Sequence, residues 1–169
     1  MNKSKRLAMA SVFTALIVVI LYLSSFFPMM SLSMVAIAGV LPAVLVSEFG
    51  IGTAAMAYVA SSVLALILVP DRMNSMLFVL LFGHYPIIKE LSERVKQKWF
   101  TWCVKLLSAN VLFVVVWILF KTMFASQISE YSGMLVFAWL GYNVIFVMYD
   151  ICLKKLVLFY KIRIGNRMR

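Results

Sequence analysis

The stretch LLFGHYPIIKELSERVKQKW, residues 80–99, changes from apolar to strongly basic along its length. It holds the chain's only histidine, followed closely by a proline, a lysine and a glutamate. Such a change is typical of a helix that leaves a bilayer, because basic residues gather at the ends of apolar spans. The stretch therefore predicts a membrane exit, with His84 and Tyr85 deeper in the span and Lys89 and Glu90 nearer its end.

The composition of the whole chain agrees with a membrane protein. Hydrophobic residues make up 64% of the 169 residues, and the mean hydropathy is +1.02. Soluble domains are nearer half apolar, and spans of ~20 residues leave room for about six helices. The apolar runs are continuous, whereas the strands of a membrane barrel alternate. We expect a single all-α integral membrane domain, a compact bundle of about six transmembrane helices.

Prolines, charged residues and one tight turn at Glu48-Phe49-Gly50 divide the chain into spans. The expected spans are about 7–27, 32–47, 51–69, 73–91, 100–124 and 132–153, followed by a basic tail at 154–169.

The basic residues predict the orientation. If the N-terminus is cytoplasmic, the inside holds twelve of the sixteen lysines and arginines and the outside only Arg72 and Lys121. Both termini are then cytoplasmic, in a bacterial plasma membrane. The tail should continue the last span as a basic helix along anionic lipid. The formal charge of +10 is explained in this way without a nucleic-acid partner.

Motifs of membrane enzymes are missing from the sequence. There is no H-E-x-x-H, no G-x-S-x-G and no Gly-rich phosphate loop. One histidine cannot build a zinc site of the H-E-x-x-H type. We expect no catalytic residue, no metal and no cofactor.

Polar residues share one depth on three consecutive spans. His84, Asn110 and Asn143 each lie ten or eleven residues along their spans, at a depth of ~15–16 Å. Aromatic residues flank them, and aromatic walls with a few polar anchors are typical of small-molecule sites. Interhelical hydrogen bonding without a ligand is the alternative. The candidate substrate-binding residues are His84, Tyr85, Asn110, Trp117, Trp139, Tyr142 and Asn143.

Charged residues near the inner face suggest a structural ion pair. Lys89 should pair with Asp150 or Glu90, because an ionisable residue in a span needs a partner. Pro86 leaves the Phe82 carbonyl without its usual amide donor, so the span should kink there.

Small residues suggest close helix contacts. Span 51–69 is rich in them, which predicts a central position in the bundle. On the first span Ala8, Ser11 and Ala15 share a face that could serve internal packing or a partner subunit.

Two stretches resemble one family, the substrate-binding S components of energy-coupling factor (ECF) vitamin transporters. RLAMASVFTALIVVILYL, residues 6–23, is similar to the first span of that family. AIAGVLPAVLVSEFGIGTAAMAYVAS, residues 36–61, is similar to its second and third spans. The resemblance covers roughly the first half of the chain.

The resemblance implies a substrate-capturing subunit of an ATP-driven importer of a vitamin-like molecule. Its implied partners are a transmembrane coupling subunit and two ATP-binding subunits, with an outward pocket lined by the last three spans. In that family an A-x-x-x-A motif on the first span docks on the coupling subunit. This chain has only near matches, Ser11-x-x-x-Ala15 and Ala10-x-x-x-Thr14. The alternatives are a scaffold resembling the cell-shape protein MreD and a small self-contained channel or transporter.

Overall fold

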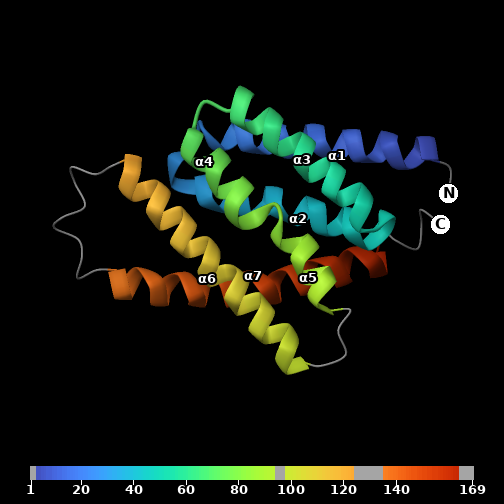
Figure 1. Cartoon of the computed structure of the whole chain (residues 1–169). Coiled ribbons are helices and arrows are strands. Elements are labelled where there is room, and N and C mark those ends of the chain that lie inside the picture. Colours follow the sequence, from blue (N-terminus) through green and yellow to red (C-terminus); the bar gives the residue numbers. More distant parts are fainter. Residues whose placement is uncertain (1–2, 94–97, 124–134, 164–169) are drawn as a thin grey trace.

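The computed structural model describes residues 3–93, 98–123 and 135–163, and all secondary structure in these ranges is helical (Figure 1). In chain order the elements are α1 (Lys3–Ser24), η1 (Pro28–Met30), α2 (Ser31–Phe49), α3 (Ile51–Leu68), α4 (Arg72–Leu77), η2 (Phe78–Phe82), α5 (Tyr85–Glu93), α6 (Lys98–Met123) and α7 (Leu135–Arg163).

Four segments of the described chain are long and apolar enough to cross a membrane. They are Ser4–Ser24, Pro28–Phe49, Ile51–Leu68 and Thr101–Ile118. Many of their large apolar side chains are exposed, among them Val12, Ile37 and Leu107. Exposed apolar residues spread along such helices suit a lipid environment better than water. The fold therefore fits a membrane-embedded helical protein.

The centre of the bundle is α2. It packs against α1, α3, α5, η2 and α7, and its buried side runs from Val35 to Val46. The small residues of span 51–69 predicted that α3 would occupy the centre of the bundle. That prediction was wrong, because α2 lies there. The small side chains of α3 instead bring it close to α1, where Ala54 and Ala57 are buried beside Ala10.

One glycine makes a turn at the end of α2, and another allows a close approach to its middle. Gly50 alone makes the turn into α3, with a φ of 84° that favours glycine. A Cβ on Gly39 would lie 2.6 Å from Phe82 Cβ and 2.7 Å from Tyr149 Oη. Gly39 is thus the point at which α2 touches both η2 and α7.

Span 73–91 is not one continuous helix, because the chain is divided there into α4, η2 and α5. Asp71 caps α4 through its Oδ1, which accepts from the amides of Met73 at 2.9 Å and Asn74 at 3.3 Å. The Gly83 amide donates to the Phe78 carbonyl at 2.7 Å, which closes a π-helical turn. Pro86 then lies in the first turn of α5, where its missing amide costs nothing. The expected kink at Pro86 is therefore a full break.

The basic tail begins as expected. Residues 154–163 continue α7 as helix, with Lys154 and Lys155 exposed. The start of α1, the end of α2 and the end of α7 lie at one end of the bundle, on the right in Figure 1.

Candidate functional site

Asp150 of α7 is the centre of a buried charged cluster. Its Oδ1 lies 2.7 Å from Lys89 Nζ of α5 and accepts a hydrogen bond of 2.6 Å from the Tyr85 hydroxyl. Lys105 Nζ of α6 lies 3.4 Å from both carboxylate oxygens. All four side chains are buried. One carboxylate therefore joins three helices.

A second carboxylate, that of Glu93, completes the cluster. Its Oε1 lies 2.8 Å from Lys105 Nζ and 3.5 Å from Lys154 Nζ. Lys154 also lies 3.8 Å from Asp150 Oδ2. Burial raises the pKa of Glu93, but the hydrogen bond from Lys105 and the nearby lysine charges outweigh it, so that its pKa lies below the ordinary value.

The sequence prediction found part of this cluster. It named Asp150 or Glu90 as the partner of Lys89, and the structure places Lys89 against Asp150. It did not include Lys105, Glu93 or Lys154. The signal for Lys105 was present, because an ionisable residue inside the apolar stretch 100–124 is itself a reason to expect a partner.

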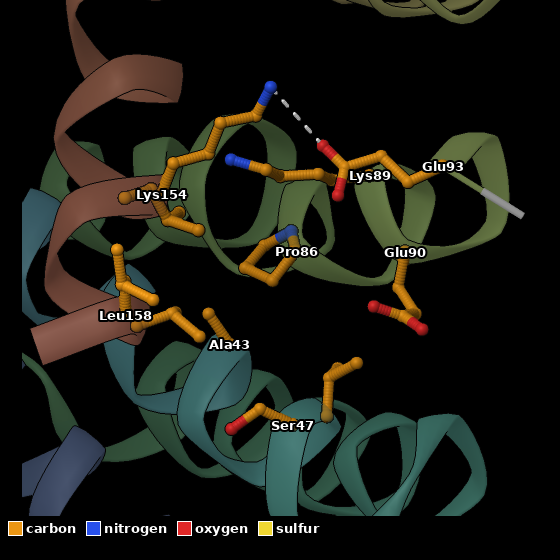
Figure 2. Close-up of a pocket in the computed structure, with 11 residues that line it drawn as sticks. Ala43, Ser47, Pro86, Lys89, Glu90, Glu93, Lys154 and Leu158 are labelled. Atoms are coloured by element: carbon orange, nitrogen blue, oxygen red, sulfur yellow. Dashed lines mark ion pairs between the residues drawn. The ribbon is translucent and has the colours of Figure 1, made fainter. Parts of the chain in front are cut away.

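A pocket of about 230 Å³ lies beside the cluster, between α2, α5 and α7 (Figure 2). Glu90 lines this pocket together with Lys89, Glu93 and Lys154. Apolar residues of α2 and α7, Pro86 and Ser47 form the rest of its wall. The pocket thus combines charged groups of both signs with an apolar surface.

His84 and Tyr85 lie at the break before α5, and they face different elements. His84 Nδ1 is 3.2 Å from the Val79 carbonyl oxygen, and its ring lies 6.3 Å from that of Tyr58 on α3. Its Nε2 is buried and has no hydrogen-bond partner among the described residues. Tyr85 turns instead to α7, where it meets Asp150 and the ring of Phe146 at 4.8 Å.

The polar residues predicted for the site on α6 and α7 form hydrogen bonds with one another. Trp139 Nε1 donates to Asn110 Oδ1 at 2.6 Å, and Asn110 Nδ2 lies 3.5 Å from Asn143 Oδ1. Asn143 Nδ2 also donates to the Trp139 carbonyl at 2.9 Å. Nearby, the Tyr142 hydroxyl donates to the Ala109 carbonyl at 3.1 Å. This arrangement ties α6 to α7.

The polar residues of neighbouring spans form two separate groups. The hydrogen bonds and ring contacts described for His84 go to Val79 and Tyr58, and those of Asn110 go to α6 and α7.

Trp117 is half-buried on α6. Asn110 also borders an open groove of about 560 Å³ whose lining comes entirely from α6. The side chain of Lys121 lies outside the described residues.

A second, apolar groove of about 640 Å³ runs between α1 and α3. Ser11 and Ala15 line it from α1, opposite Thr53, Met56 and Ala60 of α3. Ala8, Ser11 and Ala15 are all exposed. The Ser11 hydroxyl donates to the Leu7 carbonyl at 2.9 Å, so it presents little polarity to the groove.

No known protein family, curated protein or solved structure matches the chain. The described part of the fold defines the class as an all-helical protein with helices suited to a membrane.

Proposed function

We propose that the chain is the substrate-binding subunit of a membrane importer, similar to the S components of ECF transporters. It would capture a vitamin-like small molecule outside a bacterial plasma membrane and deliver it through a coupling subunit driven by two ATP-binding subunits. In this proposal α4, η2 and α5 together form one span and α7 another, which gives six spans with both termini in the cytoplasm. The start of α1 and the end of α7 lie at the same end of the bundle in Figure 1, which supports placing both termini on one side of the membrane.

The observation that carries the proposal is the groove between α1 and α3. Small side chains in a lipid-facing groove let a foreign helix approach closely, and close packing drives helix association in membranes. Of the three predicted docking residues, Ser11 and Ala15 lie in its α1 wall and Ala8 does not line it. A transmembrane helix of the coupling subunit would pack against this groove, whose lining is mostly apolar.

The substrate would bind near the break before α5. Broken helices in transporters lie beside their substrates, where non-helical backbone is tolerated because it lines a cavity. The Nε2 of His84, which has no hydrogen-bond partner within the described part of the chain, is the polar group that supports this location.

Copurification tests the proposal. The tagged chain is extracted from its native membrane in mild detergent, and the bound proteins are identified by mass spectrometry. We expect a membrane coupling subunit and ATP-binding subunits. Ser11→Phe should fill the groove and release them. Val12→Phe is the matched control, because Val12 is exposed on α1 but does not line the groove. Equal recovery with both variants, or recovery of no ATP-binding subunit, would contradict the proposal.

A second candidate is a non-transporting scaffold that resembles MreD. It is favoured by one observation: Asn110, Trp139 and Asn143 use their polar atoms on one another. A scaffold would also use the α1–α3 groove, but its copurified partners would lack ATP-binding subunits.

A further inference from the structure

The pocket of Figure 2 lies at the end of the bundle where a membrane surface is expected. Its walls come from Ala43, Val46 and Ser47 near the end of α2, from α5, and from α7 beyond Asp150. Residues 154–163 of α7 include four basic residues, Lys154, Lys155, Lys161 and Arg163, and exposed apolar ones such as Leu156, Leu158 and Ile162. Such a helix lies at the level of lipid headgroups. The pocket is therefore next to lipid headgroups rather than to hydrocarbon.

The charges of the wall are balanced. Lys89 and Lys154 oppose Glu90 and Glu93. Lys89 is committed to Asp150 at 2.7 Å, whereas Lys154 has its two carboxylates at 3.5 and 3.8 Å and its side chain is half exposed. Lys154 is thus the lysine that can take a further anionic partner. A carboxylate accepts up to about four hydrogen bonds, so Glu90 can accept from a ligand in addition to its present contact.

Figure 2 shows Lys154 and Glu90 on opposite sides of Pro86. A ligand that satisfies both sides needs an anion at one end and a hydrogen-bonding cation at the other. The volume of about 230 Å³ equals about eight water molecules of about 30 Å³ each, which suits a phosphoethanolamine group.

The apolar part of the wall points to a lipid. Leu153, Val157 and Leu158 continue the pocket along α7, and Leu158 is exposed. A free zwitterion gains nothing from this strip, whereas a phospholipid buries its glycerol and first methylenes there.

We infer that the pocket between α2, α5 and α7 binds the headgroup of a phospholipid with a primary ammonium, its phosphate at Lys154 and its ammonium at Glu90. A primary ammonium donates hydrogen bonds to a carboxylate, and a quaternary choline does not. The site shares Lys154 with the basic tail that anionic lipid would contact, but the carboxylates of Glu90 and Glu93 in its wall set it apart from that tail. It does not depend on the proposed importer function.

Native mass spectrometry of the detergent-purified chain tests the inference. The probes are phosphatidylethanolamine, phosphatidylcholine and phosphatidylglycerol with identical acyl chains, and soluble glycerophosphoethanolamine as competitor. The variants are Glu90→Gln and Lys154→Gln. The controls are Glu48→Gln and Lys155→Gln, which change neighbouring charges outside the pocket wall.

We expect one phosphatidylethanolamine to be retained in preference to the other two lipids. Loss of a charge-assisted hydrogen bond should weaken retention roughly tenfold in each pocket variant, with both controls unchanged. Equal retention of the three lipids, a preference for phosphatidylglycerol, or equal loss in the controls would overturn the inference. Displacement of the lipid by the soluble headgroup at equal concentration would overturn the lipid assignment.

Discussion

Lys89 holds Asp150 at two points: its Nζ lies 2.7 Å from the carboxylate Oδ1 and 3.0 Å from the main-chain carbonyl oxygen. Because one contact is to the backbone, the pair sets the position of α5 against α7 as well as neutralising two charges. The Tyr85 hydroxyl, one turn earlier on α5, binds the same Oδ1. This short helix therefore depends on α7 for its place in the bundle.

Asp150→Asn should destabilise the protein strongly. It leaves Lys89 and Lys105 buried without their shared carboxylate, and breaking a buried pair costs about 3–5 kcal/mol of unfolding free energy. Denaturant unfolding in detergent measures this. Glu48→Gln, on half-buried Glu48 outside the cluster, should be nearly neutral. A loss below about 1 kcal/mol for Asp150→Asn would show that the pair acts like an exposed one.

Gly39→Ala should destabilise the contact of α2 with η2 and α7. The new Cβ would lie 2.6 Å from Phe82 Cβ and 3.0 Å from the Phe82 carbonyl oxygen, and such overpacking costs about 1–3 kcal/mol. Gly52→Ala is the control, because nothing lies within 4 Å of its added Cβ. Similar thermal stability of the two variants would refute this packing.

The hydrogen bond between Trp139 and Asn110 should appear as a coupling energy. In a double-mutant cycle of Trp139→Phe and Asn110→Ala we expect about 0.5–1.5 kcal/mol. Trp99→Phe replaces Trp139→Phe in the control cycle, since Trp99 is 88% exposed, and its coupling to Asn110→Ala should be near zero. Equal couplings in the two cycles would mean that the bond contributes nothing specific.

The proposed orientation predicts which cysteines an impermeant maleimide reaches in intact cells. Single cysteines are introduced by Met29→Cys and Lys155→Cys after Cys103→Ser and Cys152→Ser. Met29 is fully exposed between α1 and α2 and should react from outside. Lys155, exposed near the other end, should react only after lysis. The reverse pattern would place both termini outside the cytoplasm.

Local features of the sequence predicted much of the fold. The helical class follows from continuous apolar runs, and the turn at Gly50 follows from the one residue that tolerates φ of 84°. The break before α5 follows from Pro86, because a proline cannot donate to the carbonyl one turn earlier. The π-turn that accompanies it depends on the fit of Gly83 against the Tyr58 ring, which no local pattern contains.

The candidate sites show the same division. Depth in a span follows from the rise of ~1.5 Å per residue, so His84, Asn110 and Asn143 could be placed at one level from sequence alone. Which of them meet depends on the rotation and tilt of each helix. Figure 1 shows α6 crossing α7 obliquely, which brings Asn110 to Trp139 and Asn143, while the break before α5 directs His84 to Tyr58.

The sequence by itself determined an apolar, helical chain and its breaks, because these depend on near neighbours. Only the tertiary structure decided that Lys105, Glu93 and Lys154 join Lys89 and Asp150, because this cluster depends on how α5, α6 and α7 pack.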